Sequence, residues 1–105
     1  MASKGPTRVS ERGLLILISL AHGEKHGYAL MQDIDEFAHA KLGPGTLYAL
    51  LSKLEEEALV EALPAHERRR PFRITPLGRE ALRVQLKEHA RLARIGLERI
   101  ALNNA

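Results

Sequence analysis

Along this chain the spacing of apolar residues changes from a helical period to alternation after Leu54 and returns to a helical period after Thr75, and these changes limit the fold most. Leucines recur at intervals of three and four residues up to Leu54, which predicts a helix with one buried face. From Leu59 to Leu63 and from Phe72 to Thr75, apolar and polar residues alternate instead, which predicts two short strands. Residues 64–71 would then form the loop of a β-hairpin. We therefore expect a mainly α-helical fold with one small hairpin.

Three helical segments precede the hairpin. The first begins after Ser10, its expected N-cap, and contains the apolar run Leu14–Leu20. The seven residues of this run fall far short of the roughly 20 needed to cross a bilayer. The second is amphipathic, and its expected apolar face consists of Tyr28, Met31, Ile34 and Ala38. The third begins at Pro44, and its expected core face consists of Leu47, Leu50, Leu51 and Leu54. Residues 1–7 lack the apolar region of a signal peptide and are expected to be a frayed terminus.

Composition narrows the class of protein. The 105 residues suffice for one domain with a modest core, and the absence of cysteine excludes disulfides and thiol chemistry and favours a cytoplasmic location. Residues 1–58 hold 6 Lys and Arg against 8 Asp and Glu, whereas residues 59–105 hold 10 against 5. Positive charge in the second half is typical of proteins with an acidic partner such as nucleic acid, although a solvated basic helix gives a similar count.

The last helix is expected to run from Pro76 to about Leu102, with Thr75 as its N-cap. It carries two apolar stripes. One consists of Leu82, Leu86, Ala93, Leu97 and Ile100, and the other of Val84, Leu92, Ile95 and Leu102. A single small domain cannot cover both sides of so long a helix, so we expect a dimer interface. Its predicted residues are Leu86, Ala93, Leu97 and Ile100.

Three helices followed by a hairpin are the order of a winged helix-turn-helix, whose third helix enters the DNA major groove. The sequence Gly43-Pro44-Gly45 at the start of this helix fits that role, because glycines let backbone N–H groups reach a phosphate. The face opposite the leucines consists of Gly45, Ala49, Ser52 and Glu56, with Tyr48 and Lys53 on its flanks. Ala49 and Ser52 can touch bases, but they discriminate less than a bidentate arginine does.

Arginines mark the hairpin as a second contact with DNA. Arg68, Arg69 and Arg70 lie in its loop, and Arg73 is close by in the second strand. Three guanidinium groups beside a helix-turn-helix favour contact with the DNA backbone over a merely solvated turn.

The two tyrosines are interpreted differently. Tyr48 lies about 100° from the leucine stripe and is interpreted as a half-exposed phosphate contact rather than a core aromatic. Tyr28 is in register with Met31 and is interpreted as packing.

Three segments together resemble the PadR-like transcriptional regulators: HGYAL at 26–30, GPGTLYALLSKLEEEALVE at 43–61 and RRRPFRITPLGREAL at 68–82. The resemblance implies a homodimer, often a repressor, that binds an inverted-repeat operator and dimerises through its C-terminal helix. It also implies phosphate contacts from Gly45, Thr46 and Tyr48, groove-facing Ser52 and Lys53, and a wing formed by the arginines. Residues 1–75 would be the DNA-binding domain, and residues 76–105 the dimerisation helix packed on it.

The chain departs from the family pattern where Ala49 replaces a common proline and Ala58 a common glycine. A non-glycine residue held in the left-handed region costs roughly 1 kcal/mol, so the exit from the third helix is expected to differ. The wing loop also lacks a glycine at its tip.

Other classes of function are weighed as well. Glu55, Glu56 and Glu57 leave open a winged-helix module that binds a protein instead of DNA, and the dimer interface could hold a small-molecule effector. His22 and His26 have a spacing suited to a metal, but Gly23 and Gly27 interrupt the helix that such a pair needs, so no metal is expected. No nucleophile with a base partner is evident, so we expect neither an enzyme nor a cofactor, and no association with membranes.

Overall fold

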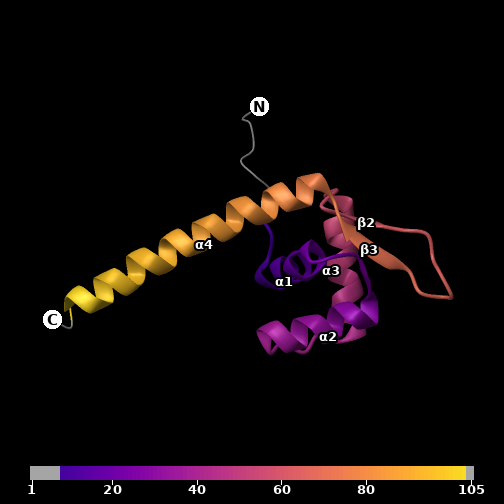
Figure 1. The fold of residues 1–105 in the computed structure, drawn as a ribbon, viewed down its shortest axis with the longest axis horizontal. Helices are drawn as coiled ribbons and strands as arrows, with labels where there is room; N and C mark the ends of the chain where they lie inside the picture. The colour runs from indigo at the N-terminus through magenta and orange to yellow at the C-terminus, as the bar shows by residue number, and fades with distance from the viewer. Residues whose placement is uncertain (1–7, 104–105) are drawn as a thin grey trace.

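The computed structural model describes residues 8–103 and contains every predicted element, with one addition (Figure 1). The elements in order are α1 (Glu11–Ala21), β1 (Lys25–His26), α2 (Gly27–Ala38), α3 (Pro44–Glu56), β2 (Val60–Ala62), β3 (Pro71–Ile74) and α4 (Pro76–Asn103). The addition is β1, which pairs antiparallel with β3 and gives the sheet the order β1-β3-β2. A strand of two residues has no alternation from which it could be predicted. The expectation for residues 1–7 lies outside the described residues.

Helix α1 is the centre of the core. It packs against α2, α3, α4 and β3, which explains why its apolar run is nearly continuous. Ile16, Leu17 and Leu20 are buried, and the Ser10 hydroxyl caps the helix by accepting from the Gly13 N–H at 3.1 Å, as predicted. Helix α3 turns three of its four predicted leucines fully inward, and the fourth, Leu50, is partly buried.

Tyr28 is not part of the core, so its interpretation as packing was wrong. Its side chain is 61% exposed, and its hydroxyl oxygen accepts a hydrogen bond from Nε2 of Gln32 at 3.3 Å. Helix α2 instead buries Gly27, Leu30 and Ile34. Tyr28 is two residues from the buried Leu30, which is about 200° around the helix, and it therefore points to solvent.

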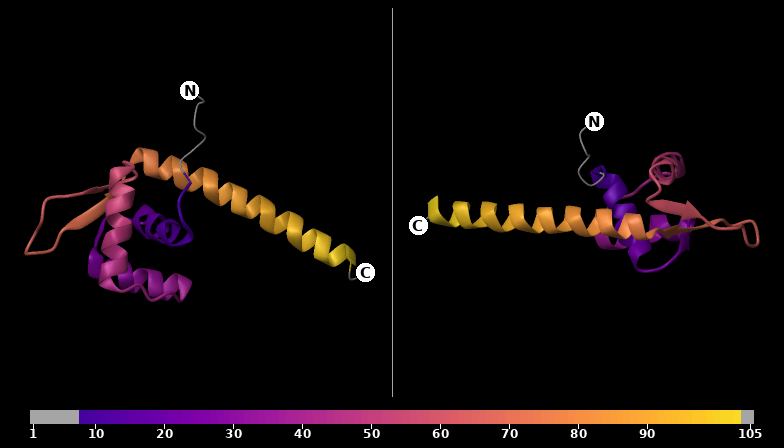
Figure 2. Two further views of the ribbon diagram at one scale, coloured as in Figure 1. Left: turned by 180° about the vertical axis from the view of Figure 1, so that it is seen from behind. Right: turned by 90° about the horizontal axis from the view of Figure 1, so that it is seen from above.

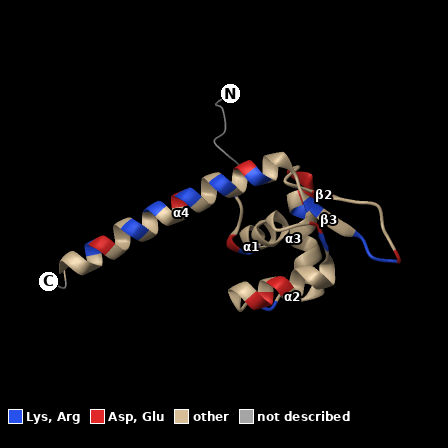
Figure 3. Ribbon diagram, viewed as in Figure 1, with Lys and Arg blue, Asp and Glu red and all other residues tan. Residues whose placement is uncertain are grey.

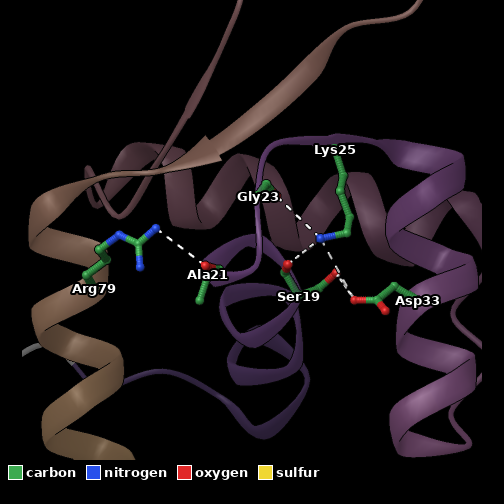
Figure 4. Close-up of polar contacts among 6 residues, drawn as sticks. All are labelled: Ser19, Ala21, Gly23, Lys25, Asp33 and Arg79. Atoms are coloured by element: carbon green, nitrogen blue, oxygen red, sulfur yellow. Dashed lines mark hydrogen bonds and ion pairs between the residues drawn. The ribbon is translucent and has the colours of Figure 1, made fainter.

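Two cations from outside α1 cap its C-terminal carbonyls (Figure 4). Nζ of Lys25 donates to the Ser19 carbonyl at 2.5 Å, and Nη2 of Arg79, on α4, donates to the Ala21 carbonyl at 3.4 Å. The buried Ser19 hydroxyl donates to Oδ2 of Asp33 on α2 at 2.6 Å. Positive charge at the negative end of the helix dipole is stabilising, and these contacts tie β1, α2 and α4 to the central helix.

Ala58 lies in the left-handed region at the exit from α3, with φ of 64°. Its carbonyl accepts a hydrogen bond from the Thr75 hydroxyl at 2.7 Å, and the same hydroxyl oxygen accepts from the Gly78 N–H at 2.9 Å, which confirms Thr75 as the N-cap of α4. The turn that follows α3 is thus fixed to the start of α4, although alanine disfavours its conformation.

Replacing Ala58 with glycine is expected to stabilise the protein by roughly 1 kcal/mol, because glycine adopts positive φ without a Cβ penalty. The midpoint of urea unfolding, followed by circular dichroism, measures the change. Ala49→Gly is the matched control, since it places glycine inside α3 and should destabilise by about the same amount. Equal destabilisation by both variants would contradict the assignment of strain to Ala58.

Helix α4 leaves the core after its first turns (Figure 2). Its buried residues are Gly78, Ala81, Leu82 and Gln85, all in the N-terminal part. The radius of gyration is 16.1 Å, whereas a compact domain of this length has about 13 Å. The predicted length of α4 is confirmed, and most of the helix extends past the domain. In the described part of the chain, no helix is long and apolar enough to span a bilayer.

Candidate nucleic-acid interface

The N-terminus of α3 is exposed and has no side-chain cap. Its N-cap is Gly43, no side chain caps its first turn, and Pro44 occupies the first helical position. The first N–H groups of any helix have no acceptor within the helix. A Cβ placed on Gly43 or Gly45 would meet no atom within 4 Å, so packing within the chain does not require either glycine. What these glycines provide is free access from outside to the backbone N–H groups.

The predicted DNA-facing residues of α3 lie together on its solvent face. They are Gly45, Thr46, Tyr48, Ala49, Ser52 and Lys53, and all are exposed. Glu55 and Glu56 continue the same exposed surface toward the end of the helix. The side chains near the start of α3 are small or neutral, whereas the acidic residues are confined to its last turn and a half. A polyanion would therefore be accepted more readily at the start of α3 than at its end.

Tyr48 has two intramolecular neighbours that fix its ring. The ring centroid lies 6.3 Å from that of Phe72 on β3, with the planes tilted by 57°. A Cβ at position 27 would collide with the Tyr48 hydroxyl, so any larger residue there would require the Tyr48 side chain to move. The side chain is nevertheless 48% exposed, in agreement with the half-exposed position predicted for it. Gly27 and Tyr48 are thus complementary, and together they orient a phenolic hydroxyl at the start of α2.

The wing ends in a tight turn that contains no glycine. The N–H of His66 donates to the Arg69 carbonyl at 2.7 Å, and the N–H of Arg69 donates to the His66 carbonyl at 2.9 Å. The two residues between them, Glu67 and Arg68, have φ of 51° and 67°. Positive φ at both central residues is the geometry of a type I′ turn, whose twist matches that of a hairpin. The turn places Arg68 at the tip.

The four predicted arginines of the wing differ in their contacts. Among the described residues, Arg68 has no hydrogen bond or ion pair, and Nη1 of Arg70 donates to the Leu63 carbonyl at 3.2 Å. Arg73 pairs with Glu61 on β2, where Nη2 lies 2.9 Å from Oε2. Nη1 of Arg69 lies 3.3 Å from Nε2 of His26, a residue that we did not predict at the site. Arg73 is thus partly neutralised, whereas Arg68 and Arg70 keep their charge available.

A hollow of about 270 Å³ separates α3 from the wing. Its lining comprises Tyr48, Leu51, Ser52, Glu55, Ala62, Arg70 and Phe72. Ser52 and Arg70 therefore border one space, although they lie on different elements. Helix α3 and the wing thus line opposite sides of the same hollow.

Charge on α4 is distributed differently from charge on the wing (Figure 3). Arg83 pairs with Glu80 and Arg91 with Glu88, each three residues apart along the helix. The hydrogen bond from Arg91 lowers the pKa of the Glu88 carboxyl below its ordinary value. These two pairs partly neutralise α4, whereas Lys87, Arg94 and Arg99 of the same helix have no ion pair among residues 8–103.

The predicted dimer residues are exposed in the single chain. Leu86 is 38%, Leu97 68% and Ile100 59% exposed, and Ala93 is exposed as well. Leu82, which shares their stripe, is buried in the chain's own core. The stripe therefore divides at about Leu86 into a part that the chain covers and a part that it leaves open.

The two histidines with metal-like spacing lie at the ends of different helices. His22 is the C-cap of α1 and His26 the N-cap of α2, so the helical break expected between them is present. Within residues 8–103, no group of three or more His, Asp or Glu residues is arranged to hold a metal ion.

Comparison with known proteins gives a consistent result. Residues 16–84 match the sequence model of the transcriptional regulator PadR-like family. Transcriptional regulator Rv3488 of Mycobacterium tuberculosis is 36% identical over 84 residues, which cover 77% of this chain and 78% of that protein. A 37.1 kDa protein in transposon TN4556 of Streptomyces fradiae is 42% identical over 86 residues, which cover 82% of this chain but 25% of the relative.

The fold has a close counterpart among solved structures. A PadR family transcription regulator from Clostridium difficile R20291 superposes with a TM-score of 0.78 at 20% identity, over 87% of this chain and 99% of the other. The predicted winged helix-turn-helix is thereby confirmed.

Proposed function

This chain belongs to the PadR-like family of transcriptional regulators, and we propose that it represses transcription by binding an inverted-repeat DNA operator as a homodimer. The family consists of transcriptional regulators and not of enzymes. In this proposal residues 1–75 bind DNA and residues 76–105 supply the dimer contact. The observation that carries it is the open start of α3 beside an arginine wing.

The open start of α3 is difficult to explain by folding alone. Glycine costs up to about 1 kcal/mol relative to alanine within a helix, and the packing of this chain does not require Gly45. A DNA phosphate, in contrast, would use both the exposed N–H groups and the positive end of the helix dipole. Ala49 and Ser52, one and two turns further on, would then face base edges in the major groove.

The inverted repeat follows from the homodimer. Two identical chains related by a two-fold axis present their recognition helices to half-sites of opposite orientation. The experiment is to select fragments of genomic DNA with the purified protein and to footprint those that bind. A palindromic footprint supports the proposal. Binding only to a protein partner, with no fragment enriched, would support the alternative raised by the acidic end of α3.

A larger side chain at position 45 is expected to lower DNA affinity without lowering the stability of the fold. Gly45→Ala should leave the chain equally stable or more stable, by up to about 1 kcal/mol, and should reduce operator affinity roughly tenfold by blocking hydrogen bonds to a charged phosphate. Gly45→Leu has a similar helix propensity and should weaken binding further. Fluorescence anisotropy and urea unfolding measure the two quantities. If the larger side chain left affinity unchanged, the start of α3 would not approach DNA.

A further inference from the structure

The wing and the start of α2 meet at one polar contact, that between Arg69 and His26. Nη1 of Arg69 lies 3.3 Å from Nε2 of His26, although the residues are 43 positions apart. On the other side of the ring, Nδ1 accepts from the Ala29 N–H at 3.4 Å and so caps α2. His26 is partly buried and Arg69 is exposed, so the contact lies at the surface.

The chemistry of the imidazole indicates that this contact lacks a hydrogen-bond acceptor. A neutral imidazole has one nitrogen that accepts and one that donates, and a guanidinium has donors only. We assign the proton to Nε2, the tautomer in which Nδ1 can accept from the Ala29 N–H, and two N–H donors then face each other. Among residues 8–103, neither Nε2 of His26 nor the Arg69 side chain has another hydrogen-bond partner. Two converging donors call for an acceptor, and one with negative charge suits the arginine best.

We infer that His26 and Arg69 hold a phosphate of the DNA backbone between them, each donating to its oxygens. This inference rests on the proposed function and adds His26 to the DNA-binding residues. The location suits it, because His26 adjoins Gly27, over which the Tyr48 hydroxyl of α3 lies. One phosphate would thus join the wing to the helix-turn-helix and fix where the wing sits on the duplex. Such a contact positions the protein without reading sequence.

Two substitutions test the shared phosphate. His26→Asn keeps an N-cap for α2 but removes the donor at the Nε2 position, and Arg69→Gln removes the charge. Each should weaken operator and scrambled DNA by similar factors, roughly tenfold, as expected for hydrogen bonds to a charged group. Arg69→Gln should also reduce the salt slope by about 2 for the dimer, whereas His26→Asn should leave the slope unchanged. Because both side chains act on one phosphate, the double variant should bind only slightly more weakly than the worse single variant.

The matched control is His22→Asn, an exposed histidine that caps the end of α1 instead. It should leave DNA affinity unchanged. Circular dichroism melting should give similar midpoints for all variants, which shows that affinity and not folding has changed.

Neutral methylphosphonates, placed singly along the operator, locate the phosphate. The unaltered protein should lose affinity at one position in each half-site where the double variant His26→Asn with Arg69→Gln is insensitive. Equal sensitivity of both proteins at every position would overturn the inference, as would ¹⁵N spectra of the free protein with the proton on Nδ1, since Arg69 would then simply donate to Nε2. Normal DNA binding with an unaffected His26→Asn variant refutes this inference alone. Absence of DNA binding by the unaltered protein refutes the proposed function as well.

Discussion

Truncation after Arg91 is expected to convert the dimer into a monomer that no longer binds its operator with high affinity. The deletion removes Leu97 and Ile100, which are 68% and 59% exposed and have no other cover in the described chain. It spares Gln85, whose side chain accepts from the Val9 N–H at 2.9 Å and donates to the Val9 carbonyl at 2.8 Å. The winged domain should therefore remain folded. Losing the second half-site removes most of the specific binding energy, so affinity should fall by a factor on the order of 10³.

Sedimentation and anisotropy check this expectation. Leu97→Ala with Ile100→Ala should weaken the dimer by the loss of buried apolar surface, whereas Arg94→Ala with Arg99→Ala serves as the control with polar residues of the same segment. A full-length chain that sediments as a monomer at micromolar concentration would refute the dimer. A truncated chain that remains dimeric would place the interface elsewhere.

DNA affinity is expected to fall steeply with salt. If the dimer neutralises roughly 6–10 phosphates, affinity should fall by about 10³–10⁵ between 50 and 200 mM salt. Replacing Arg68, Arg69 and Arg70 with alanine should reduce this slope by about 0.9 for each phosphate that the variant no longer neutralises, and should weaken operator and scrambled DNA equally.

Ser52→Arg is the contrasting variant, because it should change which sequence is preferred. Competition between operator and scrambled duplexes distinguishes the two effects. A triple alanine variant that lost only operator binding would mean that the wing reads bases, and a flat salt response would favour a protein partner.

Local signals account for what the sequence could predict. Ser10 and Thr75 were recognisable as caps because their hydroxyls precede apolar helices, and both form the expected hydrogen bonds. The exposed face of α3 followed from the angle between its residues and the leucine stripe. Ala58 could be identified as a strained position because glycine is common there in the family that the chain resembles, and its φ is positive.

Contacts between segments that are distant in the sequence account for what the sequence could not predict. The error at Tyr28 arose because two apolar lines of α2 have helical spacing, and its packing against α1 and α3 buries the line with Leu30 and Ile34. The pairing of Arg73 with Glu61 depends on the register of β2 and β3. The approach of Arg69 to His26 depends on β1, which is too short to produce a pattern.

The length of α4 has a mechanical consequence. Beyond Gln85 the helix continues for about 18 residues, or about 27 Å at 1.5 Å per residue. If the two helices of the proposed dimer cross near Ile100, the far end of the predicted interface, this segment is a lever arm that ends in the proposed DNA-binding unit. A rotation of about 5° where the arms cross displaces that unit by about 2 Å, a large part of the 3.4 Å rise between base pairs. A substitution at the crossing can thus change the distance between the two DNA-binding units, so that they no longer match the spacing of the half-sites, without itself contacting DNA.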